Sequence, residues 1–169
     1  MKILIVATPR SGSSELASRI KRYLQLKHIF FEPFNYEGDH PMYNFEDDAV
    51  VKCIVDQVPE GEDRNNPIPF YREYVKNFDR VIMLRRENLV QQIESYNWYF
   101  YRRKNGLPVN EPYEYVWQPG YEGHRDYILL CDEWLKRLSG ITNIPYVAYE
   151  NIFRIDGEKY RQNVKKVTI

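Results

Sequence analysis

Short continuous runs of apolar residues alternate along this chain with segments in which apolar residues recur every three or four positions. The runs at 3–7 and 49–55 are typical of strands buried on both faces of a sheet. Runs at 28–32, 80–84 and 145–149 predict three further strands.

The segments between these runs have the spacing of amphipathic helices. We predict a helix after residue 14, a short helix at 70–77, a third helix from Asn88, and a fourth at 126–138. The apolar positions expected to face the core are Leu16, Ile20 and Tyr23 or Leu24 in the first helix, Leu89, Ile93, Tyr96 and Phe100 in the third, and Tyr127, Ile128, Cys131, Trp134, Leu135 and Leu138 in the fourth.

Strands that alternate with helices predict an α/β fold class. We expect three layers around a mostly parallel sheet, with a P-loop-like, nucleotide-binding turn after the first strand. The length suits a single domain over residues 1–169. Within it, 35–48 is predicted to be a loop, 106–123 an irregular aromatic-rich insertion, and 157–169 a peripheral tail.

Charge and hydropathy argue against several classes of protein. The chain has 24 basic and 24 acidic residues, so the basic excess of a general nucleic-acid or membrane-surface binder is missing. No apolar run approaches the roughly 18 residues of a membrane span, and the run at 3–7 is too short for a signal-peptide core. We therefore expect a cytoplasmic protein that binds small molecules rather than nucleic acid or membrane.

The cysteines and histidines do not have the spacing of a metal site, and no metal is expected. Cys53 and Cys131 stand inside apolar patterns, which is typical of buried free thiols, and a disulfide between them is the minor alternative. His28, His40 and His124 do not pair with each other or with a cysteine at helical or hairpin spacing.

The segment after the first predicted strand has the equipment of an anion site. A tight turn into a helix presents unpaired backbone N–H groups, and the helix dipole adds positive charge there. Gly12 permits a close approach, Arg10 supplies charged donors, and the Gly-x-x-x-x-Gly-Lys-Ser/Thr pattern of nucleotide triphosphatases is absent. The competing interpretation is a serine-rich turn without a ligand. The candidate hydroxyl donors are Ser11, Ser13 and Ser14.

A second group of cations follows the strand predicted at 80–84. Arg85 and Arg86 stand where that strand gives way to a helix, and Ser95 lies on the helix. A cation at the carboxyl end of a strand and a hydroxyl on the next helix can converge on one ligand crevice. On these residues alone, two surface arginines and an ordinary helical serine explain the pattern equally well.

In this order, the two segments resemble the donor-binding elements of sulfotransferases that use 3′-phosphoadenosine-5′-phosphosulfate (PAPS). Thr-Pro-Arg-Ser-Gly-Ser-Ser at 8–14 is similar to the loop that holds the 5′-phosphate and the sulfuryl bridge. Leu-Arg-Arg-Glu-Asn-Leu at 84–89 is similar to the element that binds the 3′-phosphate. The resemblance assigns the 5′ side and a catalytic role to Arg10, and the 3′-phosphate to Arg86 (with Arg85 as the alternative) and Ser95.

The same family suggests a base. Phe-Glu-Pro-Phe at 31–34 resembles a segment of carbohydrate sulfotransferases, and the trehalose sulfotransferase branch carries a glutamate base at this position. Sulfuryl transfer needs a group that takes the proton of the acceptor hydroxyl. We therefore assign Glu32 as the general base, with His28 and His40 as alternatives. Lys52 is either a donor contact or a lysine that reaches solvent from the sheet edge.

The resemblance implies an enzyme that transfers the sulfuryl group of PAPS, its co-substrate, to an acceptor hydroxyl on a small molecule or glycan. Aromatic residues of 96–121 can stack on a sugar or on adenine, and the basic triplet 102–104 is predicted to be a solvated helix end. The chain departs from the family in its short length and in lacking the late Arg-Lys-Gly-type loop. The alternatives are a non-catalytic nucleotide- or anionic-glycan-binding module and, more distantly, a nucleotide or nucleoside kinase. The acceptor, the regiochemistry and the oligomeric state stay open.

Overall fold

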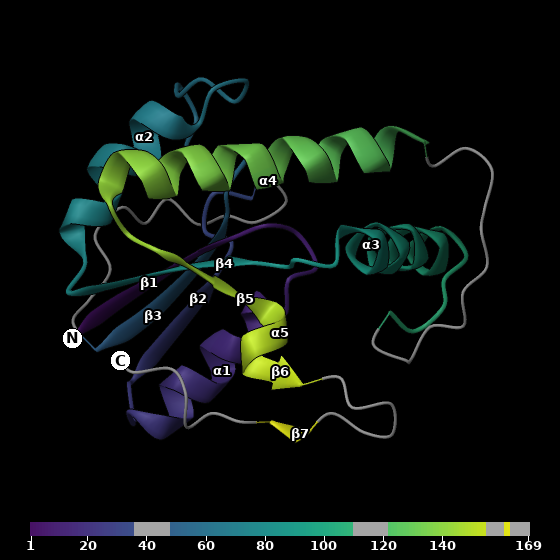
Figure 1. Cartoon of the computed structure of the whole chain (residues 1–169). Coiled ribbons are helices and arrows are strands. Elements are labelled where there is room, and N and C mark those ends of the chain that lie inside the picture. The colour runs from purple at the N-terminus through teal and green to yellow at the C-terminus, as the bar shows by residue number, and fades with distance from the viewer. Residues whose placement is uncertain (36–47, 110–121, 155–160, 163–169) are drawn as a thin grey trace.

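Parallel strands form the centre of the molecule. The computed structural model describes residues 1–35, 48–109, 122–154 and 161–162. The strands of the main sheet are β1 (Lys2–Ala7), β2 (His28–Phe31), β3 (Ala49–Ile54), β4 (Arg80–Arg85) and β5 (Tyr146–Ala148). In the described residues these five strands run in the order β2-β3-β1-β4-β5, and all neighbours are parallel (Figure 1). The order reverses at β1, where open α/β sheets form a crevice beyond the carboxyl ends of their strands.

Helices cover both faces of this sheet. They are α1 (Ser13–Tyr23), α2 (Ile68–Tyr74), α3 (Leu89–Lys104), α4 (Glu122–Thr142) and α5 (Tyr149–Ile152), with a 3-10 turn at Val75–Asn77. Figure 1 shows α2 and α4 on one side of the sheet and α1 and α5 on the other. The side chains of β1 alternate between these two core layers: Leu4 and Val6 pack with residues of α2 and α4, and Ile3 and Ile5 with residues of α1 and α5. The predicted three-layer α/β class is thereby confirmed.

The predicted elements occur in the predicted order, with local corrections. Of the alternatives Tyr23 and Leu24 for the last core position of the first helix, the structure selects Leu24, which packs against the core, whereas Tyr23 is 71% exposed. Tyr149 does not end the last strand but begins α5. The insertion predicted to reach 123 ends earlier, because α4 begins at Glu122.

The face that α3 buries is polar and not the predicted apolar one. The apolar stripe of Leu89, Ile93, Tyr96 and Phe100 is only partly buried. The residues that α3 buries are polar: Gln92, Ser95 and Arg102. Positions 92, 95, 99 and 102 share the same helical spacing, and the structure turns this polar stripe toward the rest of the molecule. Hydrophobic spacing therefore located the helix but not the side that it buries.

Several other expectations concern the ends of the chain and the cysteines. Cys53 and Cys131 are buried and free, as predicted. The short strands β6 (Phe153–Arg154) and β7 (Arg161–Gln162) pair with each other in an antiparallel ribbon. Most of the loop at 35–48, most of the insertion and nearly all of the tail lie outside the described residues. Within the described residues no helix combines the length and the apolar character that a membrane span requires.

Candidate functional site

The turn between β1 and α1 lies at the carboxyl end of the central strand. Arg10 and Gly12 have φ values of 56° and 76°, and Gly12 is the N-cap residue of α1. No side chain caps this helix in the described part of the chain, so its first N–H groups stay available to an anion. The Ser11 hydroxyl is fully buried and donates to the Thr8 carbonyl over 2.7 Å, so it stabilises the turn. Ser13 is buried, whereas Ser14 is exposed.

Gly12 is also fixed by packing. A Cβ atom at this position would lie 2.7 Å from Cε2 of Tyr149 and 3.2 Å from Cε2 of Phe153. The 2.7 Å distance lies inside the van der Waals contact limit, so Tyr149 would have to shift, and the left-handed φ adds a second restriction on side chains. The turn therefore rests directly on the aromatic side chain of Tyr149.

Arg10 is held by α3. Its Nε donates to the Ser95 hydroxyl over 3.2 Å, and its guanidinium lies over the Tyr99 ring, 5.2 Å from the centroid. The sequence paired Ser95 with Arg86, but in the structure the hydrogen bond of Ser95 is to Arg10. The serine thus belongs to the same cluster as the first cation, while its predicted role at a 3′-phosphate stays a prediction.

Arg85 and Arg86 have different environments. Arg85 donates from Nε and Nη2 to Asp132 over 2.8 and 3.2 Å in a buried bidentate ion pair. Arg86 is 7% exposed and donates from Nη2 to Gln91, and its Nε has no hydrogen-bond partner among the described residues. Glu150 lies 3.9 Å from that Nε. Because Asp132 already engages the guanidinium of Arg85, the arrangement favours Arg86 as the anion-binding residue of the two.

Tyr149 connects Arg86 to the β1–α1 turn. The guanidinium of Arg86 lies over its ring, 4.7 Å from the centroid, and the edge of the same ring packs against Gly12. Arg86 is therefore separated from the β1–α1 turn by the width of one aromatic ring. Arg10 is part of this turn, and Arg86 lies across the Tyr149 ring from its Gly12.

Glu32 lies just beyond the carboxyl end of β2, with a φ of 51°. Its carboxylate accepts hydrogen bonds from Lys52, from Gln57 over 2.9 Å and from Asn35 over 3.3 Å. Burial alone would raise the pKa of Glu32, but the charge of Lys52 and these hydrogen bonds outweigh it and lower the pKa. The group is thus ionised near neutral pH.

The positions of Lys52 and His28 disagree with some of the alternative roles predicted for them. Lys52 is 2% exposed and bonds to Glu32, so it does not reach solvent from the sheet edge. His28 begins β2, four residues before Glu32 and about 13 Å along the strand. His28 therefore lies at the amino end of β2, whereas Glu32 lies at its carboxyl end. His40 lies outside the described residues.

Two polar residues of this region have no role in the sequence argument. Gln92 is fully buried and contacts the β1–α1 turn. Asp56 follows β3, accepts a hydrogen bond from the Tyr127 hydroxyl over 2.7 Å, and keeps its buried Oδ1 without a partner among the described residues. Burial raises the pKa of Asp56. Its position directly after a predicted strand was a signal that could have marked it.

The triplet 102–104 was predicted to be a solvated helix end, but Arg102 is buried. Its side chain is 6% exposed and its guanidinium lies over the Trp98 ring, 5.2 Å from the centroid. Arg103 and Lys104 are exposed, as expected of a helix end. The Trp98 ring covers the charged guanidinium of Arg102, and the N–H donors of that guanidinium lie inside the fold.

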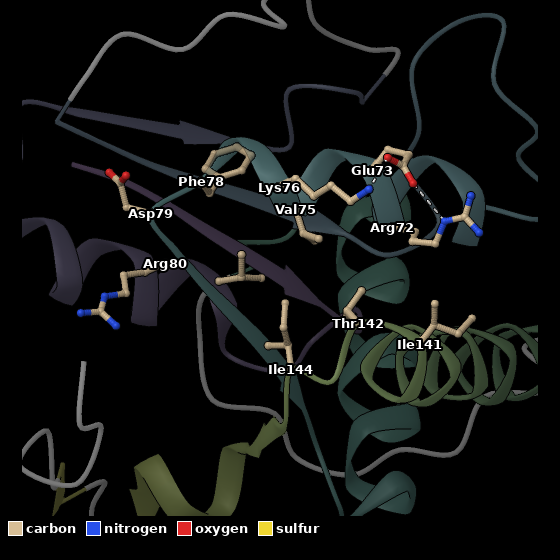
Figure 2. A pocket seen from close by; sticks show the side chains of 11 residues that line it. Arg72, Glu73, Val75, Lys76, Phe78, Asp79, Arg80, Ile141, Thr142 and Ile144 are labelled. Carbon is tan, nitrogen blue, oxygen red and sulfur yellow. Dashed lines mark hydrogen bonds and ion pairs between the residues drawn. The ribbon is translucent and has the colours of Figure 1, made fainter.

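A separate pocket of about 690 Å³ lies at the other end of β4 (Figure 2). Arg80, the first residue of β4, lines it, whereas the candidate site adjoins the last residues of that strand. Three of its charged lining residues pair with each other, because Glu73 accepts from Arg72 over 3.1 Å and from Lys76 over 2.6 Å. The pocket is therefore distinct from the arginine clusters.

Comparison with known proteins leaves the family open. No protein-family model and no curated protein sequence matches the chain. A solved structure, deoxyadenosine kinase from M. mycoides with bound dATP, is 19% identical, with the match covering 89% of this chain and 92% of that chain at a TM-score of 0.43. A similarity of this size does not establish a shared activity.

Proposed function

We propose that the chain is a sulfotransferase that binds PAPS across the β1–α1 turn and transfers its sulfuryl group to an acceptor hydroxyl, with a sugar as the candidate acceptor. In this proposal Arg10 and the N–H groups of residues 11–14 bind the 5′-phosphosulfate. Arg86 binds the 3′-phosphate, and Glu32 takes the proton of the acceptor.

One observation carries the proposal: Arg10 belongs to the β1–α1 turn, and the buried Arg86 lies on the Tyr149 ring that packs against Gly12 of the same turn. The Arg10 guanidinium is oriented by Ser95, and Arg86 lies on the ring that packs against Gly12. A donor with phosphates at both ends of one nucleoside needs two separate cations around one crevice. A nucleoside triphosphate carries its phosphates in one chain, so its cations gather around that chain rather than at both ends of the nucleoside.

The chemistry requires positioning more than covalent help. The oxygen of the acceptor hydroxyl attacks sulfur, the bond from sulfur to the bridging oxygen breaks, and adenosine 3′,5′-bisphosphate leaves while Glu32 accepts the proton. In this proposal Arg10 stabilises the negative charge that develops on the bridging oxygen. The lowered pKa keeps Glu32 ionised and ready to accept a proton, although it also makes the carboxylate a weaker base.

Thermal unfolding with two ligands tests the proposal. Adenosine 3′,5′-bisphosphate at 100 times its Kd should stabilise the folded protein by about 2.7 kcal/mol, which corresponds to roughly 5–10 °C in Tm. Arg86→Gln should abolish this shift. Arg72→Gln, an exposed change at the far pocket, should leave it intact. A shift with ATP and Mg²⁺ alone, or no shift with either ligand, would contradict a PAPS site.

A nucleoside or nucleotide kinase is the second candidate, and Asp56 is the observation that favours it. Asp56 lies two residues after the end of β3, the strand that pairs with β1, and one of its carboxylate oxygens lacks a partner among the described residues. Mg²⁺ at phosphoryl-transfer sites is held by one or two carboxylates together with substrate phosphates. The missing Gly-Lys-Ser/Thr in the turn argues against this candidate. A Tm shift that needs both ATP and Mg²⁺ and disappears in Asp56→Asn would support it.

A further inference from the structure

We propose that Gln92 is a positioning residue that holds the Pro9–Arg10 peptide of the β1–α1 turn in its anion-binding orientation. The ligand part of this proposal rests on the proposed function, whereas the effect on the turn does not. Gln92 lies on α3, far from the turn in sequence, and is 0% exposed.

The contacts of Gln92 reach the turn at two points. Its Nε2 donates to the Thr8 hydroxyl over 2.8 Å and to the Pro9 carbonyl. The carbonyl can only accept, so exchanging the nitrogen and the oxygen of the amide would set two acceptors against each other. The Pro9 contact therefore fixes which way the carboxamide faces.

Holding the Pro9 carbonyl also aims the next N–H group. The described residues contain no cis peptide bond, so the N–H of Arg10 points away from the Pro9 carbonyl and away from Gln92. Arg10 has a φ of 56°, a left-handed conformation that a residue with a side chain adopts only when its surroundings impose it. Gln92 supplies that restraint at the residue immediately before Arg10.

The neighbouring contacts of α3 act on the same segment. Ser95 and Tyr99, three and seven positions after Gln92, hold the guanidinium of Arg10 by a hydrogen bond and by ring contact. Gln92 thus orients the backbone of Arg10 while its neighbours orient the side chain. A turn that is ordered before the ligand arrives loses less conformational entropy on binding.

Gln92→Met tests this role, since methionine fills a similar volume without the hydrogen bonds. Two measurements are compared with the wild type: amide hydrogen exchange of residues 8–14 in the absence of ligand, and the Kd for adenosine 3′,5′-bisphosphate. We expect exchange in the turn to accelerate while the middle of α1 is unchanged, and the Kd to rise about tenfold. Val75→Ala, a buried change in the 3-10 turn at the far edge, should destabilise the protein without selective exchange at 8–14.

A second variant separates positioning from simple filling of space. A glutamate at position 92 can donate to the Pro9 carbonyl only when it is protonated. Gln92→Glu should therefore restore slow exchange of the turn at acidic pH and lose it as the pH rises, relative to the wild type at each pH. Selective exchange in Gln92→Met, together with a wild type that does not bind the bisphosphate, would support the positioning role and reject the proposed function. Unchanged exchange at 8–14 in Gln92→Met would overturn the positioning role, whatever the ligand result.

Discussion

The ion pair between Lys52 and Glu32 offers a sharp test of the site's electrostatics. Lys52 is 2% exposed, and its ammonium group bonds to the carboxylate of Glu32. Lys52→Met would keep most of the side-chain volume and remove the charge. Glu32 would then keep Gln57 and Asn35 as donors but lose its charged partner.

The expected loss of stability follows from that geometry. Removing one partner of a buried ion pair typically destabilises a protein by about 3–5 kcal/mol. The Glu32 side chain is 30% exposed and retains two neutral donors, so we expect about 2–3 kcal/mol at pH 7. The double variant Glu32→Gln with Lys52→Met should be less destabilised than Lys52→Met alone, because it leaves no uncompensated charge.

The sign of the pH dependence is also fixed. The pKa of Glu32 in the folded protein is lowered, so the ionised group stabilises the fold above the ordinary carboxyl pKa. That contribution is lost as the pH falls through the lowered value. Without Lys52, the pKa of Glu32 should be higher than in the wild type, because only the hydrogen bonds from Gln57 and Asn35 then oppose the effect of burial. The cost of the unpaired charge should disappear when the carboxylate is protonated. The stability difference between wild type and Lys52→Met should therefore be largest at pH 7 and narrow toward pH 3–4.

Urea unfolding of the wild type, Lys52→Met and the double variant at pH 7, 5 and 4 measures these differences. Equal stability of Lys52→Met and wild type at pH 7 would refute the reasoning. So would a difference that stays constant across this pH range, because the ion pair then makes no pH-dependent contribution.

Three further predictions concern residues around the site and the core. Gly12→Ala should destabilise the protein by at least about 2 kcal/mol in urea unfolding, because it combines a left-handed φ with a 2.7 Å contact. The control Gly61→Ala, at a φ of 93° and with nothing within 4 Å, should show only the backbone effect of about 1 kcal/mol. Asp132→Asn should weaken the buried pair with Arg85 and lower stability by about 3 kcal/mol, while the Kd for adenosine 3′,5′-bisphosphate stays unchanged; a large rise in that Kd would implicate Arg85 in binding. Cys53, whose pKa burial raises to about 12, should react with a thiol reagent at pH 8 only at the rate of unfolding, and fast labelling of the native protein would contradict its burial.

The number and order of strands and helices could be predicted because they depend on local patterns. Continuous apolar runs identified the strands of the sheet, and three- and four-residue spacing identified α1, α3 and α4. The turn at 8–14 and the position of Glu32 after β2 also follow from neighbouring residues. The pattern was least informative where two stripes on one helix compete, as in α3, since apolar spacing alone does not decide which stripe the fold buries.

Which side chains meet across the sheet edge was decided by the tertiary structure alone. Arg10 bonds to Ser95 and Lys52 to Glu32, pairs separated by 85 and 20 positions. Such contacts depend on the order of the strands and on how α3 packs against the sheet. The spacing of neighbouring residues predicts neither of these. The sequence by itself determined the elements and the types of polar group at their ends. The packing of the helices against those ends determined that Arg85 pairs with the buried Asp132 and that Arg86 lies beside the turn. The physical reason is that a buried charge needs a partner, and only the tertiary structure decides which group lies next to it.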